Sequence, residues 1–271
     1  MNYRFYLVLI LLITFVSSSI YAAFRFALIT DMHIQLNDNK PTIDLQNTLS
    51  DINKMTDIDF VIIAGDVTEK GDSASLLKAK SILSTLKVPY YITFGNHDMI
   101  SSNPNRRIYK SIFGADRFTF THKNIQFIGF TTGPVLKSGI GHVNSCDLKW
   151  IDGELSKTEK STPIIAITHY PMQNGDVDNW FELTDILRKY NVQALINGHY
   201  HRNAILNYDG IAGIVCRSTL SKNESLGGYT IFNISDSIQV SEKIVNEVPR
   251  EWLVFPIDKK TYDLPDKSLR K

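Results

Sequence analysis

Short runs of β-branched and aromatic residues recur along the chain, separated by segments that are richer in polar and turn-forming residues. Runs of this composition are typical of strands that are buried on both faces of a sheet. We therefore predict strands at residues 26–30, 60–64, 90–94, 125–131, 164–168 and 192–197.

Three segments between these runs carry apolar residues at the spacing of an α-helix. We expect each apolar stripe to pack against the core, since such stripes more often serve packing than cofactor binding. The apolar positions are Leu45, Leu49, Ile52 and Met55, then Leu76, Ala79, Leu83 and Leu86, then Trp180, Leu183, Ile186, Leu187 and Tyr190.

After Gly198 the pattern changes to short alternating segments at 204–208, 211–217 and 228–234. Alternation with turn residues between the segments indicates antiparallel hairpins. We predict that these segments form a second, partly antiparallel sheet. Helices would then lie outside and sheets inside a layered α/β sandwich.

Residues 1–23 have the features of an export signal: a single cation at Arg4, an apolar run at 5–16 that only Thr14 interrupts, and small residues after it. An uncleaved membrane anchor is the alternative, because residues 5–24 are just long enough to span a bilayer. We favour cleavage, since the first predicted strand follows without a linker. The protein would then be exported (periplasmic or secreted), with membrane contact only through this segment if it stayed uncleaved.

We expect residues 24–240 to form the folded domain. Residues 241–271 are charged and contain three prolines, which is typical of a packed arm followed by a loose tail. Export would also allow a disulfide between Cys146 and Cys216. Free buried thiols fit the sequence equally well, because spacing alone does not place the two residues within bonding range.

The 271 residues are 43% hydrophobic and 21% charged, which is ordinary for a soluble globular protein and excludes disordered and collagen-like classes. The 29 Lys and Arg residues nearly balance the 28 Asp and Glu residues. Binding of long nucleic acid would therefore lack its main electrostatic driving force, and we expect no such partner.

Side chains that bind metals well gather where five of the predicted strands end. Ligands of α/β proteins bind beyond the carboxyl ends of strands, so these segments can converge on one cleft. Four of the segments, taken alone, fit a hydrogen-bonded turn or a helix cap better than a metal site, and the Gly-His-x-His run at 198–201 alone fits either equally well. Five unrelated turns would rarely share the same donors, however. Five of the seven histidines lie in these segments, which are residues 30–33, 64–66, 94–98, 168–171 and 197–201.

This ordered set resembles the motifs of the calcineurin-like metallophosphoesterases, and the resemblance covers residues 24–234. It implies an α/β fold, namely a four-layer α/β/β/α sandwich with two mixed β-sheets, and two adjacent metal ions. The first ion would be bound by Asp31, His33, Asp66 and His201, and the second by Asp66, Asn96, His169 and His199.

The donor chemistry agrees with this assignment. A carboxylate such as that of Asp66 has two anionic oxygens and can bridge two cations, while imidazoles complete each shell. No cysteine is among the ligands. We therefore expect two divalent metal ions as cofactors, Mn, Fe or Zn or a mixed pair, rather than Ca or Mg alone.

The resemblance also implies a mechanism. The nucleophile would be a hydroxide that bridges the two metal ions. The histidine at the position of His97 is not a ligand in the family but gives a proton to the leaving oxygen, and we expect Asp98 to hold its imidazole by a hydrogen bond.

Differences between this sequence and the motifs of other branches of the family narrow the range of expected substrates. Glu69 stands where purple acid phosphatases have a metal-binding tyrosine, and residues 65–71 lack the arginine of the phosphoprotein phosphatases. The better match is the class III cyclic-nucleotide phosphodiesterase-like branch, which has the Gly-Asn-His-Asp run of residues 95–98. Residues 131–133 depart from the usual turn of that branch.

We therefore predict an enzyme, an exported metallophosphoesterase that cleaves small phosphomonoesters or phosphodiesters. A cyclic-nucleotide phosphodiesterase and a nuclease are alternatives within the enzyme class. A non-catalytic metal-binding module is the alternative outside it. His142, Tyr170 and Trp180 could reach the cleft, although packing roles fit them at least as well.

Overall fold

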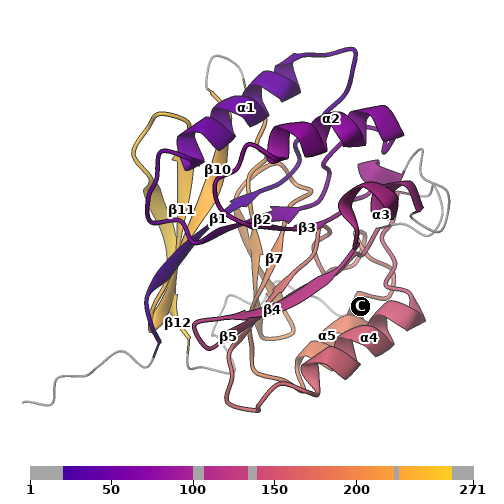
Figure 1. Cartoon of the computed structure of the whole chain (residues 1–271). Coiled ribbons are helices and arrows are strands. Elements are labelled where there is room, and N and C mark those ends of the chain that lie inside the picture. Colours follow the sequence, from indigo (N-terminus) through magenta and orange to yellow (C-terminus); the bar gives the residue numbers. More distant parts are fainter. Residues whose placement is uncertain (1–20, 100–106, 134–138, 223–225, 258–271) are drawn as a thin grey trace, which may run out of the picture.

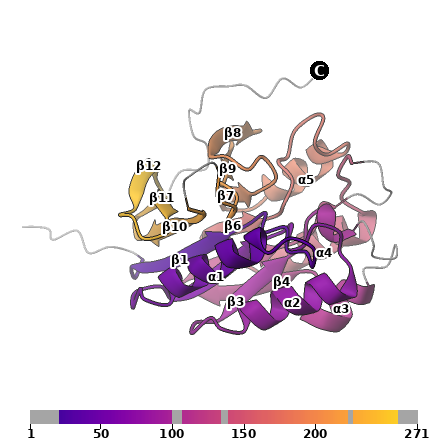
Figure 2. The ribbon, with the colours of Figure 1, turned by 90° about the horizontal axis from the view of Figure 1, so that it is seen from above.

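The computed structural model describes residues 21–99, 107–133, 139–222 and 226–257, which form two mixed β-sheets packed face to face between helices (Figure 1 and Figure 2). The first sheet has the order β12-β11-β10-β1-β2-β3, in which β1 is parallel to β2 and antiparallel to β10. Its strands are β1 (Phe24–Ile29), β2 (Phe60–Ala64), β3 (Tyr90–Thr93), β10 (Gly228–Ile234), β11 (Ser237–Ile244) and β12 (Arg250–Pro256).

The second sheet has the order β4-β5-β6-β7-β9-β8. Strands β5, β6, β7 and β9 run parallel, whereas the edge strands β4 and β8 are antiparallel to their neighbours. The strands are β4 (Phe118–His122), β5 (Ile125–Gly129), β6 (Ile164–Ile167), β7 (Val192–Asn197), β8 (Ala204–Tyr208) and β9 (Ile211–Val215).

Alternation of side chains along the buried strands produces the layers. In β1, Phe26 and Leu28 point into the space between the sheets, whereas Ala27 and Ile29 pack beneath the helices. The first sheet is covered by α1 (Lys40–Ile52), α2 (Ser73–Leu83) and α3 (Arg107–Phe113), the second by α4 (Ser145–Leu155) and α5 (Trp180–Leu187), and a short 3-10 helix, η1 (His97–Met99), follows β3.

An aromatic cluster fills the space between the sheets. Phe26 stacks on Phe60 of β2, with ring centroids 5.2 Å apart, and on Phe232 of β10, at 4.6 Å. Phe127 of β5 meets the Phe26 ring edge-on at 5.5 Å. All four side chains are buried, so they hold strands of both sheets together.

The predicted four-layer α/β/β/α sandwich with two mixed sheets is confirmed. The helical stripes lie on α1, α2 and α5 except for their last residues, Met55, Leu86 and Tyr190, which follow the helix ends. One strand was assigned to the wrong sheet. Residues 228–234 form β10 of the first sheet, where Phe232 lies opposite Phe26 of β1. The pattern of a strand does not identify its neighbour, and these two partners are far apart in the sequence.

The described part of the predicted C-terminal arm lies mostly in the first sheet. The boundary at residue 240 falls inside β11, and β12 pairs with β11 at the sheet edge. Only Phe255 among the seven residues of β12 is buried, so the segment lacks the alternation that would have identified it. Residues 1–20 and 258–271, which hold most of the predicted export signal and the predicted tail, lie outside the described residues.

Among the helices of the described residues, none has the length and apolar character to cross a membrane. The two cysteines are both free: Cys146 is exposed on α4, and Cys216 is buried just after β9. The disulfide alternative is therefore not realised in this structure.

Candidate metal centre

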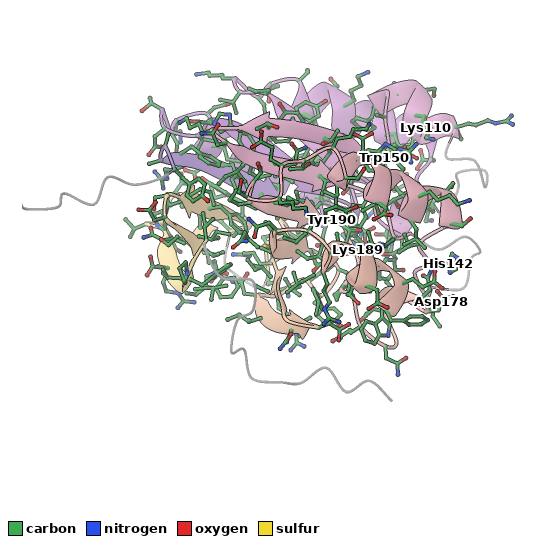
Figure 3. The ribbon with its side chains drawn as sticks, turned by 90° about the horizontal axis from the view of Figure 1, so that it is seen from below. Lys110, His142, Trp150, Asp178, Lys189 and Tyr190 are labelled. Carbon is green, nitrogen blue, oxygen red and sulfur yellow. The ribbon has the colours of Figure 1, made fainter. Side chains whose placement is uncertain are left out.

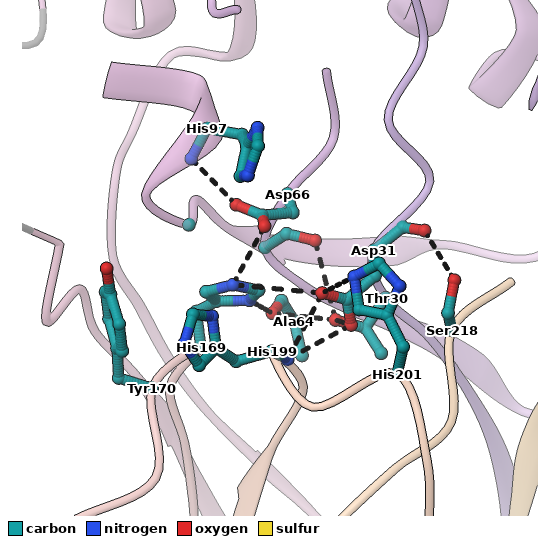
Figure 4. Close-up of polar contacts among 12 residues, drawn as sticks. Thr30, Asp31, Ala64, Asp66, His97, His169, Tyr170, His199, His201 and Ser218 are labelled. Atoms are coloured by element: carbon teal, nitrogen blue, oxygen red, sulfur yellow. Dashed lines mark hydrogen bonds and ion pairs between the residues drawn. The ribbon is translucent and has the colours of Figure 1, made fainter. Parts of the chain in front are cut away.

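The five polar segments from both sheets meet at the carboxyl ends of β1, β2, β3, β6 and β7 (Figure 4). Asp31 follows β1 and Asp66 follows β2, while His169 follows β6 and both His199 and His201 follow β7. Figure 4 shows the three histidines directed toward the two aspartates. The segments therefore converge as the sequence predicts.

Asp31, His33 and His201 form a first group of donor atoms. The Nε2 atoms of His33 and His201 are 3.1 Å apart, and His201 Nε2 lies 3.2 Å from Asp31 Oδ1. Donors that share one ion at about 2.0–2.2 Å lie at such distances from one another. These three side chains can therefore bind a single metal ion.

Asp66, His169 and His199 form a second group. Asp66 Oδ2 lies 3.1 Å from His169 Nε2 and 3.8 Å from His33 Nε2, so this carboxylate reaches both groups. The buried atoms Asn96 Oδ1 and His169 Nε2 make no hydrogen bond to a described residue. Buried polar atoms are rarely left without a partner. The donor set therefore fits divalent cations, which would satisfy both atoms.

Hydrogen bonds behind two histidines fix which ring nitrogen faces the donor groups. His169 Nδ1 lies 2.8 Å from Ala64 O, and a carbonyl oxygen only accepts, so Nδ1 carries the proton and Nε2 presents its lone pair. His33 Nδ1 likewise donates to Glu69 Oε2 at 2.9 Å. Partners of this kind orient metal-binding histidines in proteins.

The backbone of the site has an uncommon conformation. Five of the candidate ligands have φ values between 48° and 71°, in the left-handed region that glycine favours. Hydrogen bonds hold this backbone in place, for example from His33 N to Asp66 O at 3.0 Å. Such strain concentrates at functional sites. The five residues are Asp31, His33, Asp66, His199 and His201.

Gly95 and Gly198 are required by close packing against the carboxylates. A Cβ at Gly95 would collide with Asp66 Oδ1. A Cβ at Gly198 would collide with Thr30 Oγ1 and would lie 2.7 Å from Asp31 Oδ2. The absence of a side chain at these positions therefore makes room for the two aspartates.

Asp66 and His169 form a buried charged pair. Burial opposes the charge on each, but the carboxylate of Asp66 raises the pKa of His169 to about 9, and His169 holds the pKa of Asp66 well below its usual range. Burial and the nearby His169 charge lower the pKa of His199 to about 4. In the metal-free chain the protonated, positively charged His169 therefore stabilises the negative charge of the buried Asp66 carboxylate.

His97 lies beside the two donor groups, at the start of η1. Its Nδ1 donates to Glu69 O at 3.0 Å, so Nε2 is the ring atom that remains for proton exchange. Its backbone N–H donates to Asp66 Oδ1 at 3.0 Å, which fixes the residue next to the donor groups. His97 is also within ligand range of His33 and Asp66.

The predicted hydrogen bond between Asp98 and His97 is wrong. Both oxygens of the buried Asp98 carboxylate are engaged elsewhere: Oδ1 accepts from Thr68 N at 2.8 Å, and Oδ2 accepts from Val67 N at 3.1 Å and from Gly95 N at 3.0 Å. Asp98 therefore ties the turns after β2 and β3 together. Its place next to His97 in the sequence did not reveal that the side chain turns toward the backbone.

Glu69 takes the role that the sequence assigned to Asp98. Its carboxylate contacts His33, and its carbonyl oxygen holds His97, so one residue links a candidate ligand to the candidate proton donor. The only signal in the sequence was a carboxylate three residues after Asp66.

The other polar and aromatic residues singled out in the sequence have packing or surface roles. His142 Nδ1 pairs with Asp178 Oδ1 at 2.7 Å on the surface that Figure 3 shows. Trp180 is buried in the core beneath the second sheet. Tyr170 is buried, and its ring lies 4.3 Å from that of His199, so it supports a candidate ligand from behind.

Comparisons with known proteins identify relatives of this chain. A sequence model of calcineurin-like phosphoesterases matches residues 24–203, which include every candidate ligand. A "probable cyclic nucleotide phosphodiesterase" of Ruthia magnifica subsp. Calyptogena magnifica is 27% identical over 229 residues, which are 80% of this chain and 95% of that protein. A "probable glycerophosphodiester phosphodiesterase GpdQ" of Arcobacter nitrofigilis is 30% identical over 194 residues, 64% of this chain and 70% of that protein.

A solved structure has the same fold. A dimetal phosphatase from Danio rerio superposes with a TM-score of 0.69, over 86% of this chain and 99% of that chain, at 14% sequence identity.

Proposed function

The chain belongs to the calcineurin-like phosphoesterase family and is a metallophosphoesterase, and we propose that it is an exported enzyme that uses two divalent metal ions to hydrolyse small phosphomonoesters or phosphodiesters. The observation that carries this proposal is the pair of buried atoms without hydrogen bonds, Asn96 Oδ1 and His169 Nε2, beside the carboxylate of Asp66. Without metal ions Asn96 Oδ1 would stay unsatisfied, and His169 Nε2 would have only a proton shared with Asp66 Oδ2, 3.1 Å away.

Each ion would have its own group of ligands and would share the carboxylate of Asp66. Imidazole-rich shells favour Mn, Fe or Zn. When bound, the two ions would neutralise charge on the phosphoryl group and lower the pKa of a water molecule toward about 7, so that hydroxide becomes the nucleophile. In this proposal Asp31, His33 and His201 hold the first ion, and Asn96, His169 and His199 hold the second.

His97 would supply the proton that the leaving oxygen needs. Its Nδ1 is held by Glu69 O, so transfer would occur at Nε2. The side chain is 30% exposed, which allows a substrate oxygen to reach it. The carboxylate of Glu69 would meanwhile orient His33 for metal binding.

The names of the relatives favour small phosphodiesters, either cyclic nucleotides or glycerophosphodiesters. The balance of 29 basic and 28 acidic residues disfavours a nuclease that acts on long polymers. A non-catalytic metal-binding module is disfavoured because the donor set and the candidate proton donor are all present.

Export is supported by the N-terminal sequence alone. The test is fractionation of cells that express the full chain, followed by mass analysis of the mature protein. We expect a periplasmic or secreted protein with an N-terminus near residue 24. A membrane-bound protein of full length would support the anchor.

Metal reconstitution tests the enzymatic proposal. Metal-stripped protein would be loaded with Mn²⁺, Fe²⁺ or Zn²⁺ and assayed with p-nitrophenyl phosphate and bis(p-nitrophenyl) phosphate. We expect turnover only after binding of about two metal equivalents per chain, and loss of turnover with a chelator. Tight metal binding without turnover on a broad panel of phosphoesters would instead favour the binding module.

A further inference from the structure

A groove of about 390 Å³ extends from the metal centre toward the start of α1. Its inner end contains three imidazoles, and its outer end contains the segment that leads into α1. Ser221, in the segment that follows β9, lines the opposite side of the groove. The lining residues at the two ends are His33, His97 and His201, and then Asp38, Lys40 and Ser221.

The position of His97 indicates which part of a substrate enters this groove. A proton donor must lie beside the oxygen that leaves, and His97 borders the groove. The leaving group would therefore extend away from the scissile phosphate into the groove. This step rests on the proposed function, in which His97 protonates the leaving oxygen.

Hydrogen bonds between distant segments set the shape of the groove. Lys40 Nζ donates to Ser221 O at 2.8 Å, across the groove. Ser221 N and Oγ both donate to Asp44 Oδ2 of α1 at 2.9 Å. These bonds fix the position of the groove walls, and Lys40, the lysine of the described lining, is already engaged.

Two side chains in the groove lining have polar atoms that make no hydrogen bond to a described residue. Asp38 Oδ1 accepts from Lys40 N at 2.8 Å, but Asp38 Oδ2 makes no hydrogen bond to a described residue. The side-chain amide of Gln35 is likewise without a partner in the described part of the chain. These groups can accept hydrogen bonds from hydroxyls.

A nucleobase would find no stacking surface in the described lining of the groove. Aromatic side chains on which a base can stack contribute strongly to base binding in single-stranded nucleic acid sites. The described lining contains no Phe, Tyr or Trp, and its apolar residues are Pro41 and Leu220. Its three imidazoles are those of two candidate metal ligands and the candidate proton donor.

We propose that this groove binds the leaving group of a phosphodiester and selects a short polyhydroxylated alcohol, such as a glycerol unit, through Asp38 and Gln35. The groove thereby favours glycerol-type diesters over cyclic nucleotides as substrates of the same metal centre.

The first test compares the metal-loaded wild type with Asp38→Asn. Glycerophosphoglycerol carries hydroxyls on its leaving group, whereas bis(p-nitrophenyl) phosphate carries none. We expect the KM for glycerophosphoglycerol to rise about tenfold, as for loss of one hydrogen bond to a charged acceptor, with kcat changed less than about twofold. The KM for bis(p-nitrophenyl) phosphate should change less than about twofold. Asp185→Asn, on the exposed face of α5, is the matched control.

A second test measures the binding of competing ligands and does not depend on hydrolysis of the glycerol diester. Glycerol 3-phosphate and methyl phosphate, which differ in their hydroxyls, would compete with bis(p-nitrophenyl) phosphate. We expect the wild type to bind glycerol 3-phosphate about tenfold more tightly than methyl phosphate and Asp38→Asn to lose that preference. Gln35→Ala should reduce the same preference.

The outcomes separate the two proposals. Equal effects of Asp38→Asn on both substrates, or a kcat/KM for 3′,5′-cyclic AMP above that for glycerophosphoglycerol in the wild type, would overturn the assignment of the groove and leave the hydrolase intact. A metal-loaded wild type that hydrolyses no phosphoester would overturn the proposed function, and the groove assignment with it.

Discussion

The carboxylate of Glu69 accepts a hydrogen bond from Nδ1 of His33 at 2.9 Å, while Nε2 of the same imidazole faces the metal centre. The carbonyl oxygen of Glu69 holds His97 at 3.0 Å. One residue thus orients a candidate ligand through its side chain and the candidate proton donor through its backbone. The carboxylate also lies 3.6 Å from His97 Nδ1, so substitution of the side chain should affect His33 most and His97 less.

We predict that Glu69→Gln weakens metal binding more than it affects proton transfer by His97, because the carbonyl oxygen of residue 69 still holds His97 Nδ1. Glutamine has nearly the same size but is a weaker acceptor, so we expect affinity for one of the two ions to fall about 10- to 100-fold. Titration against a chelating indicator measures this change. Asp178→Asn, whose carboxylate pairs with His142 at the surface, is the matched control. Unchanged affinity would show that the contact to His33 is only structural.

We predict that His97→Ala lowers turnover and keeps the metal content. A general acid contributes about 10²- to 10⁴-fold to rate, and the loss should be largest for substrates with poor leaving groups. Turnover of alkyl and nitrophenyl diesters, together with metal analysis of each protein, measures both quantities. Loss of metal would identify His97 as a ligand, which its proximity to His33 and Asp66 makes a clear alternative.

Metal uptake should release a proton at neutral pH. The carboxylate of Asp66 raises the pKa of His169 to about 9 against the opposing effect of burial, so the metal-free chain holds this proton at pH 7 to 8. A metal ion needs the lone pair of Nε2 and must displace the proton. The apparent affinity should therefore rise with pH up to about 9 and then level off. Calorimetry in two buffers of different ionisation enthalpy counts the proton released.

The raised pKa of His169 also predicts how the stability of the metal-free protein depends on pH. Because the folded-state pKa of His169 is raised above its ordinary value of 6.5, the stabilisation from the protonated pair is complete below that value and is lost as pH rises through about 9. Urea unfolding of metal-stripped protein at pH 6 and pH 9 tests this sign. A higher stability at pH 9 would contradict the pairing of Asp66 with His169.

We predict that Phe26→Ala destabilises the fold by about 3–5 kcal/mol, since it leaves a cavity where rings from both sheets meet. Chemical unfolding of the metal-loaded protein measures the free energy of unfolding. Phe181→Ala removes a ring that is 46% exposed and should cost much less. Similar losses for the two variants would show that the space between the sheets is loosely packed.

Local patterns predict much of this fold because a buried strand carries its signature in its own residues. The strands β1, β2, β6 and β7 are entirely or almost entirely buried and are predominantly apolar. The edge strand β12 is mostly exposed and carries no such signature. The helices α3 and α4 and the strand β4 were likewise not predicted. In β4 two exposed threonines alternate with three half-exposed residues, so no position of the strand is fully buried.

The sequence by itself determined which side chains gather at the metal centre, because each follows a recognisable strand and the carboxyl ends of parallel strands share one edge. Only the tertiary structure decided where those side chains point. Asp98 turns to backbone N–H groups, Glu69 reaches His33, and β10 pairs with β1 rather than with the second sheet. The physical reason is that a side chain's partner depends on the dihedral angles of its turn and on the segment packed against it. Neither is encoded in the spacing of residues along the chain.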